Sequence, residues 1–243
     1  MTQAYDSLAE WFEYLNDDCD YVTWSQYFID GLSRLNAGRE GLEVGCGSGA
    51  FCRALTRAGY LMTGADISEP MLRRGMGLAR KEGLNIPFVQ ADAARLKSPK
   101  KYDFLIAPND CYNYLPGDKL ATAFRHAAGC LKSGGIFWVD VSSEYKFREK
   151  IANNIFADDR EEITYLVFNK LFEDRVEMDV TLFIRKGDGT FERKDEKHTQ
   201  YIHTEETLTS CLTAAGFEVI AVEGHLGVNK EESDRLNLIC RKR

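Results

Sequence analysis

The sequence predicts an α/β fold in which a doubly wound, mostly parallel seven-stranded sheet carries an inserted antiparallel β sub-domain and an N-terminal helical lid. Three observations support this prediction. Strand-like apolar segments alternate strictly with helical segments between residues 41 and 141, which is the order of a parallel sheet with crossover helices. Aromatic residues crowd the first 36 positions. Later in the chain the helices stop, and extended stretches with a two-residue periodicity begin.

The N-terminal segment 1–36 is expected to form the lid. Thr23, with Gln26 three residues later, resembles a capping box that would start a helix. Apolar residues then recur at helical spacing, namely Trp24, Phe28, Leu32 and Leu35. Aromatic side chains in such a segment either belong to the core or close over a ligand, and the sequence leaves both interpretations open.

The central segment contains the alternating elements of the parallel sheet. Strands are predicted at 41–44, 60–66, 86–90, 102–107 and 136–141, and helices at 50–58, 68–83 and 118–131. The last two strands have continuous apolar character, which is typical of strands that are buried on both faces. Such a sheet is Rossmann-like, and sheets of this kind bind ligands along the carboxyl ends of their strands.

The later part of the chain changes its pattern twice. Extended segments are predicted at 163–168, 176–185 and 198–202, with a hairpin turn signal at 186–190. A helix that starts at Thr204 and two strands, 217–222 and 236–240, return to the first pattern. We therefore divide the chain into a lid at 1–36, a main domain at 37–150 and 204–243, and an inserted antiparallel sub-domain at 151–203.

The composition limits the classes of protein to which the chain could belong. With 44% hydrophobic and 28% charged residues, it has the makeup of a folded globular protein. A net charge of -7 disfavours a general nucleic-acid binder, which needs a basic face. Seven cysteines without a Cys-x-x-Cys pair predict neither a disulfide framework nor a metal site. Since we find no signal-peptide pattern and no apolar run as long as a membrane span, we expect a cytoplasmic protein without membrane association.

A glycine-rich turn, Gly45-Cys46-Gly47-Ser48-Gly49, lies between the first predicted strand and the first predicted helix of the sheet. Glycines let the backbone turn sharply, and the N–H groups at a helix start can meet polar ligand atoms. Asp66 ends the next predicted strand, close to the ~20-residue spacing expected of a carboxylate that binds ribose hydroxyls. These residues alone allow either a dinucleotide or S-adenosylmethionine.

Glu43, two places before the first glycine, helps to separate these two cofactors. A carboxylate beside the turn would repel a pyrophosphate, whereas it could anchor a cationic amine through hydrogen bonds of the loop. S-adenosylmethionine carries an ammonium and a sulfonium and has no phosphate. Glu43 therefore favours S-adenosylmethionine over NAD.

The motifs resemble those of the class I S-adenosylmethionine-dependent methyltransferases over most of the chain. Segment 42–49 matches the first motif, 64–68 the second, whose acidic residue holds the ribose, and 90–93 the third, whose aspartate bonds the adenine. The strand at 102–107 and the turn at 131–137 match as well. The resemblance implies S-adenosylmethionine as cofactor and S-adenosylhomocysteine as product. It also implies the cofactor-binding residues Glu43, Gly45, Cys46, Gly47, Gly49, Asp66, Ile67, Met71, Asp92, Ala93 and Asn109.

A narrower resemblance connects the N-terminal segment with a bacterial branch of small-molecule methyltransferases. The shared pattern runs from Tyr5 through Tyr21 to Trp24. It implies that Tyr21 and Trp24 contact the cofactor. Phe12-Glu13 departs from the Tyr-Asp of that branch, so no role is carried over to Phe12.

The methyl acceptor is expected to be a small molecule beside the sulfonium. Candidates for its pocket either follow the fourth strand or lie where the insert rejoins the main domain, and they are Asp110, Tyr112, Asn113, His198 and Tyr201. His198 and Tyr201 fall on opposite faces of a regular strand, so they are not expected to face the acceptor together. No catalytic residue is assigned, because a sulfonium is already an activated leaving group and alignment is the main task.

Other functions are compatible with some of these residues. A NAD-dependent oxidoreductase could use the same turn, a sensor could bind S-adenosylmethionine without transferring its methyl group, and an RNA or protein methyltransferase could share the fold. The acidic net charge disfavours an RNA substrate. The inserted sheet could also pair with a second copy to form a homodimer.

Overall fold

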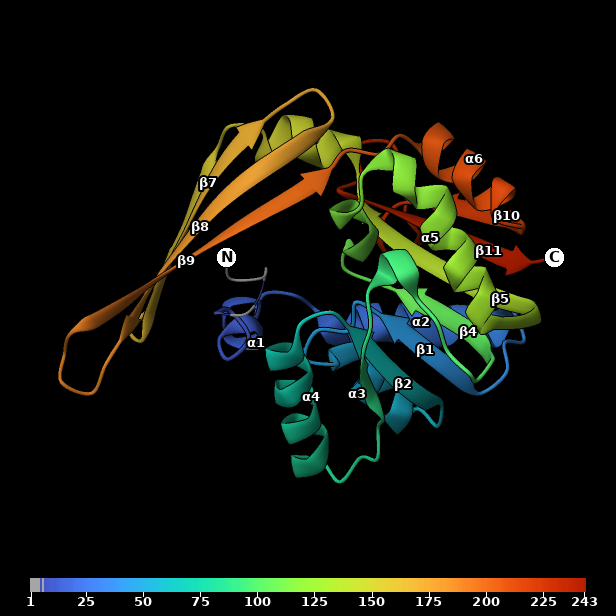
Figure 1. Cartoon of the computed structure of the whole chain (residues 1–243), viewed down its shortest axis with the longest axis horizontal. Coiled ribbons are helices and arrows are strands. Elements are labelled where there is room, and N and C mark those ends of the chain that lie inside the picture. Colours follow the sequence, from blue (N-terminus) through green and yellow to red (C-terminus); the bar gives the residue numbers. More distant parts are fainter. Residues whose placement is uncertain (1–4, 6) are drawn as a thin grey trace.

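The computed structural model describes Tyr5 and residues 7–243, and in this part of the chain it contains two sheets (Figure 1). The larger sheet has seven strands in the order β10-β11-β5-β4-β1-β2-β3. Every neighbouring pair is parallel except the two that involve β11. This arrangement confirms the predicted mostly parallel sheet. Its strands are β1 Glu40–Val44, β2 Leu61–Asp66, β3 Phe88–Gln90, β4 Tyr102–Ala107, β5 Leu131–Ser142, β10 Phe217–Glu223 and β11 Arg235–Lys242.

Helices cover both faces of this sheet, and they are α2 Tyr21–Arg34, α3 Ala50–Arg57, α4 Glu69–Lys81, α5 Gly117–Cys130 and α6 Glu205–Ala214. Successive residues of a strand point to opposite faces. Accordingly, Phe137 and Val139 of β5 pack in one apolar cluster with α5 and α6. Ile136 and Trp138 pack in a second cluster with α2, α3 and α4. Because both faces are covered, the carboxyl edge of the strands is left for a binding site.

Helix α2 begins earlier than the predicted capping box. Asp20 is its N-cap, and the Asp20 carboxylate accepts a hydrogen bond from the Thr23 backbone N–H at 3.0 Å. The Gln26 amide donates to Asp30 rather than reaching back to the helix start. The predicted cap at Thr23 is therefore wrong, because an aspartate one turn upstream takes that place.

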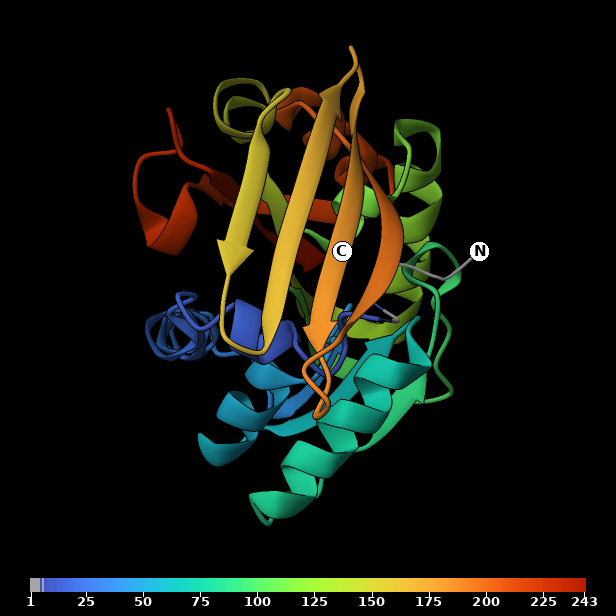
Figure 2. The same ribbon diagram turned by 90° about the vertical axis from the view of Figure 1, so that its left-hand side faces the viewer.

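The smaller sheet is antiparallel, and Figure 2 shows its broad face in front of the main sheet. Its strands, in spatial order, are β6 Ile155–Asp159, β7 Ile163–Leu171, β8 Arg175–Arg185 and β9 Phe191–Tyr201. Two details differ from the sequence prediction. β6 was not predicted, and β9 begins at Phe191 rather than at His198. Both strands carry charged residues on an exposed face, so their apolar alternation is too weak to identify them.

The N-terminal segment before α2 lies against the smaller sheet. It contains the short helix α1 Phe12–Leu15, and Leu8 joins Val167 and Val180 in a third apolar cluster. Helix α2 itself packs on the main sheet, where Phe28 is fully buried. The part of the chain that could cover a ligand is therefore the short segment that precedes α2.

Three further observations concern the chemistry that this fold could support. Within Tyr5 and residues 7–243, no helix is long and apolar enough to cross a membrane. The same residues include no group of three or more His, Cys, Asp or Glu side chains that could hold a metal ion. All seven cysteines are free thiols.

Candidate cofactor and acceptor site

A cavity of about 280 Å³ opens at the carboxyl ends of strands β1 to β4. Its walls come from the glycine turn, from the residues that follow β2, β3 and β4, and from the N-terminal segment. Most of the predicted cofactor-binding residues line it, namely Gly45, Gly47, Asp66, Ile67, Met71, Asp92, Ala93 and Asn109. The remaining lining residues are Tyr5, Phe12, Ala91, Cys111, Tyr114 and Leu115.

The glycine turn is fixed by hydrogen bonds to the neighbouring strand β2. The backbone N–H groups of Gly45 and Cys46 both donate to the Ala65 carbonyl, at 2.8 and 3.0 Å. A side chain at Gly47 would meet the terminal methyl group of Met71 at 2.9 Å. The turn therefore presents bare backbone to the cavity, and Met71 lies directly beside it.

Asp66 faces the cavity with its carboxylate held in place. Its Oδ2 accepts a hydrogen bond from the Gly47 N–H and its Oδ1 from the Ser68 N–H, both at 2.8 Å. Burial raises the pKa of Asp66, and these N–H donors oppose the rise. Carboxylate oxygens have lone pairs for several donors. The fixed carboxylate can therefore also accept hydrogen bonds from the hydroxyls of a ligand.

Asp92 supplies a second fixed carboxylate after β3. Its Oδ1 accepts a hydrogen bond from the Ala94 N–H at 2.8 Å, and its Oδ2 pairs with Arg95 at 3.2 Å. Met71 and Ala93 also line the cavity and give it apolar surface. A hydrogen-bond acceptor next to apolar surface suits a flat ring that bears an amino group.

Glu43 lies below the turn and does not line the cavity. It is only 2% exposed, and its Oε2 accepts a hydrogen bond from the Cys52 N–H at 2.7 Å, near the start of α3. Burial raises the pKa of Glu43 to about 7 against the hydrogen bonds from Cys52. The carboxyl can therefore act on a ligand only through the turn above it.

Replacing Glu43 by glutamine is expected to remove a loss of stability that accompanies a rise in pH. The folded-state pKa of about 7 lies above the ordinary value of 4.5, so the folded state binds this proton more tightly than the unfolded chain. The contribution of Glu43 to wild-type stability should therefore fall as the pH rises from about 4.5 through 7, by up to about 1.4 kcal/mol per pH unit. Glutamine does not titrate, and its carbonyl can still accept from Cys52. Urea unfolding across this range should show the wild type losing stability relative to Glu43→Gln as the pH rises; a constant difference between the two would exclude Glu43 as the titrating group.

A buried ion network fixes the wall that follows β4. Asn109 and Asp110 both have positive φ, 58° and 54°, and their N–H groups donate to Oδ2 of Asp140 at 2.9 and 3.4 Å. Arg235 pairs with Asp140 and with Asp110, each at 2.6 Å. Burial alone would raise the pKa of Asp110, but Arg235 and Lys146 outweigh burial and lower it. Asp110 therefore anchors the wall, whereas Asn109 lines the cavity.

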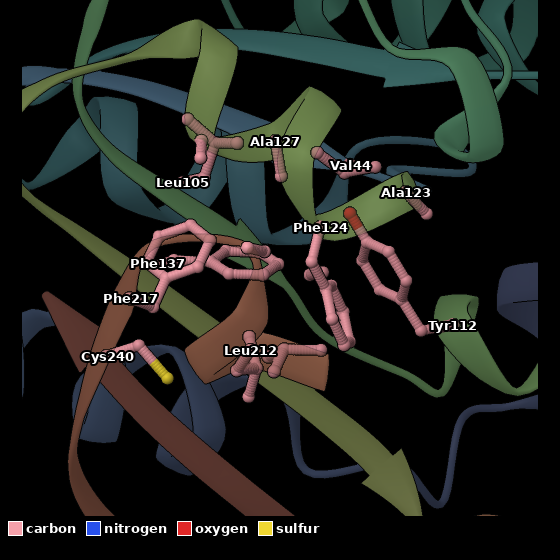
Figure 3. Packing of buried hydrophobic residues seen from close by; sticks show 14 of the residues in the cluster. Val44, Leu105, Tyr112, Ala123, Phe124, Ala127, Phe137, Leu212, Phe217 and Cys240 are labelled. Atoms are coloured by element: carbon pink, nitrogen blue, oxygen red, sulfur yellow. The ribbon is translucent and has the colours of Figure 1, made fainter. Parts of the chain in front are cut away.

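Tyr112 points away from the cavity. The chain after β4 forms a 3₁₀ helix at Cys111–Tyr114, in which side chains three residues apart share a face. Cys111 and Tyr114 accordingly line the cavity. The Tyr112 ring packs in the core against Phe124, with ring centroids 5.0 Å apart (Figure 3). The prediction of Tyr112 as a pocket residue is therefore wrong.

Asn113 is fully buried and joins two parts of the chain. Its amide accepts a hydrogen bond from the Ser142 N–H and donates to the Tyr201 carbonyl, both at 2.9 Å. Asn113 and Tyr201, both predicted as pocket residues, therefore lie outside the cavity lining, and Tyr201 contributes only this backbone carbonyl. His198 reaches the cavity only indirectly, because its Nδ1 lies 3.0 Å from the hydroxyl of Tyr114.

Four other residues that were predicted to contact the cofactor lie outside the cavity lining. Trp24 packs edge-on against Phe51, with ring centroids 5.1 Å apart, and Tyr21 does so at 5.4 Å. Cys46 is buried in the apolar cluster below the turn. Gly49 is the N-cap of α3. None of these four residues lines the cavity, and Tyr21 and Trp24 pack instead on α3, the helix that follows the turn.

Four side chains that sequence reasoning did not assign to the site close the cavity on the side of the insert. They are Tyr5, Phe12, Tyr114 and Leu115. The hydroxyls of Tyr5 and Tyr114 lie 2.8 Å apart, and the rings of Tyr5 and Phe12 pack edge-on at 5.7 Å. Tyr5 belongs to the N-terminal segment that resembles the bacterial branch, and Tyr114 follows β4. Their contact spans 109 positions of the sequence, so spacing gave no sign of it.

Comparison with known proteins points to one family. A family model described as a methyltransferase domain matches residues 42–135. The protein named "Putative methyltransferase GWCH70_2453" of Geobacillus sp. (strain WCH70) is 30% identical over 98% of this chain and 100% of its own length. A crystal structure of an S-adenosylmethionine-dependent methyltransferase from Clostridium acetobutylicum ATCC 824 has a TM-score of 0.88 at 25% identity, over 99% of each chain.

A more distant structure shares the fold. CalS10 from Micromonospora echinaspora, an amino pentose methyltransferase with bound SAM, has a TM-score of 0.75 at 16% identity, and the match covers 100% of this chain and 98% of that one. The full-length relatives, the matching family model and the cavity at the carboxyl edge agree with one another. The chain belongs to the class I S-adenosylmethionine-dependent methyltransferases and is a methyltransferase.

Proposed function

We propose that this methyltransferase binds S-adenosylmethionine in the cavity at the carboxyl edge and transfers the methyl group to a small-molecule acceptor. One observation carries the proposal. The bare backbone of the turn and the fixed carboxylates of Asp66 and Asp92 follow successive strands along a single cavity. The amino acid part of the cofactor would lie at the turn, the ribose at Asp66 and the adenine at Asp92 beside Met71.

The chemistry asked of such a site is modest. The acceptor displaces the sulfonium methyl group in line, and the leaving group is a neutral thioether. The protein has to align the two reactants and exclude water. Tyr5, Phe12 and Tyr114 form an aromatic wall on the side that remains for the acceptor.

Two features favour a small acceptor over a macromolecule. The N-terminal segment covers the cavity and is tied to β9 by hydrogen bonds from the N–H groups of Tyr5, Ser7 and Leu8 to the Glu196 carboxylate. The net charge of -7 is unfavourable for a nucleic acid. The amino pentose acceptor of CalS10 supports the inclusion of small amines among the compounds to test.

Replacing Asp66 by alanine is expected to weaken the binding of S-adenosylhomocysteine by about 1–3 kcal/mol, because hydrogen bonds to the ribose and to the turn are lost. Isothermal titration calorimetry measures this loss directly. Asp118→Ala is the matched control, since Asp118 is an exposed aspartate at the start of α5. Unchanged affinity of Asp66→Ala would refute the assigned site, and tight binding of NAD in place of S-adenosylhomocysteine would refute the proposed cofactor.

A further inference from the structure

Four polar side chains form a hydrogen-bonded series that ends at the cavity. Glu196 Oε2 lies 3.0 Å from His198 Nε2, and His198 Nδ1 lies 3.0 Å from the Tyr114 hydroxyl. The Tyr114 hydroxyl lies 2.8 Å from that of Tyr5. The two tyrosines line the cavity, whereas Glu196 and His198 are buried behind them. None of the cofactor contacts proposed above uses this series.

The charge of Glu196 sets the direction of these hydrogen bonds. Burial alone would raise the pKa of Glu196, but hydrogen bonds from His198, Ser7 and Tyr5 outweigh burial and lower it. The carboxylate is therefore ionised near neutral pH and accepts the Nε2 proton of His198. In a neutral imidazole the other nitrogen, Nδ1, then carries the free lone pair and accepts the hydrogen bond from Tyr114.

The two tyrosines are poor bases by themselves. Burial, together with the nearby charge of Asp110, raises the pKa of Tyr114. Burial, Tyr114 and Asp110 raise the pKa of Tyr5 in the same way. A neutral phenol can take a proton from a reacting group only if its own proton leaves. Tyr114 has a route for that proton, since its hydroxyl is hydrogen-bonded to Nδ1 of His198.

We propose that Tyr114, His198 and Glu196 form a proton relay for small acceptors whose reacting nitrogen or oxygen carries a proton, such as amines and phenols. This proposal rests on the proposed function. The acceptor atom forms a bond to the methyl carbon, and the S–C bond breaks with its electron pair going to sulfur. The acceptor proton passes to the Tyr114 oxygen while the Tyr114 proton passes to His198 Nδ1. Glu196 stabilises the imidazolium that results, and the proton returns to solvent after the product leaves.

The N-terminal segment completes the relay. Glu196 accepts the Tyr5 N–H at 2.8 Å on the same oxygen that faces His198. The Tyr5 ring packs edge-on against the His198 ring at 4.9 Å, and His198 is only 5% exposed. When this segment lies in place, it therefore orients the acid–base pair and keeps bulk water away from the proton path.

The test uses the full chain with a tritium-labelled methyl donor and a panel of small amines, phenols and thiophenol at about pH 8. Thiophenol is the internal control, because it is already ionised and needs no base. Tyr114→Phe and His198→Gln keep the ring or the hydrogen bonding but interrupt the relay. We expect kcat for amines or phenols to fall by about 100-fold or more in both variants. KM and the affinity for S-adenosylhomocysteine should stay within about twofold, and transfer to thiophenol should be retained.

Tyr112→Phe is the matched control variant. Within the part of the chain that the structure describes, the Tyr112 hydroxyl is buried without a hydrogen-bond partner, so its removal should leave kcat unchanged. Wild-type kcat in Tyr114→Phe or His198→Gln would overturn the relay, as would a parallel loss of cofactor affinity, which indicates a structural role. If the wild type methylates thiophenol alone, the relay fails while the proposed function stands. If it binds no S-adenosylhomocysteine or methylates no member of the panel, both fail.

Discussion

Replacing Arg235 by methionine is expected to lower the free energy of unfolding by about 3–5 kcal/mol, because it leaves two buried carboxylates without their counter-charge. Asp140 is fully buried and Asp110 is 9% exposed. In the wild type, the guanidinium pairs with both of them and lies over the Trp24 ring, 4.9 Å from its centroid. Methionine preserves much of the side-chain length and removes the charge. Chemical denaturation near neutral pH measures the loss.

The loss should also reach the cavity. Asp140 Oδ2 holds the N–H groups of Asn109 and Asp110, whose positive φ values require such support. When Arg235 is removed, repulsion between the two carboxylates pushes on this segment. We therefore expect weaker binding of S-adenosylhomocysteine in Arg235→Met, although Arg235 does not line the cavity.

Two comparisons make this result specific. Arg241→Met removes an arginine side chain that donates a hydrogen bond to the Gly134 carbonyl, and it should cost much less. The deficit of Arg235→Met should shrink as the pH falls, because burial raises the pKa of Asp110 once Arg235 is gone, and protonation of Asp110 then removes part of the uncompensated charge. A deficit that is the same at about pH 5 and pH 8 would show that packing, and not charge, is lost.

The main sheet could be predicted because its signals are local. Each strand and each crossover helix has its own run of apolar residues, and the turn at 45–49 marks the boundary between two of them. Asp66 could be placed for the same reason, since the ends of adjacent parallel strands lie at one edge. The start of α2 was misplaced because Asp20 and Thr23 are both good caps, one turn apart.

The side of the cavity toward the insert, which we propose for the acceptor, could not be predicted, because it is built from contacts between distant segments. Tyr114 meets His198 across 84 positions and Glu196 meets Tyr5 across 191. These contacts depend on how the insert folds over the main domain. The orientation of Tyr112 and Tyr114 depends in turn on a single 3₁₀ turn, whose local geometry no periodicity in the sequence reveals.

Replacing Gly45 by alanine is expected to destabilise the protein by about 2–5 kcal/mol and to reduce the affinity for S-adenosylhomocysteine at least about tenfold. Gly45 has a φ of +71°, a conformation that costs a residue with a Cβ about 1–2 kcal/mol. The new Cβ would also lie 2.5 Å from the Cys111 sulfur, and overpacking of that kind costs about 1–3 kcal/mol. Because Cys111 lines the cavity, relief of this clash has to move the cavity wall.

A second glycine separates the two costs. Gly134, in β5, has a nearly identical φ of +73°, and a Cβ there meets nothing within 4 Å. Gly134→Ala should therefore show the conformational cost alone, with unchanged cofactor affinity. In Gly45→Ala combined with Cys111→Gly, space for the new methyl group is restored, so part of the affinity should return. Equal destabilisation by Gly45→Ala and Gly134→Ala would mean that the turn tolerates the new side chain. No recovery of affinity in the double variant would mean that Cys111 does not transmit the effect of that side chain to the cavity.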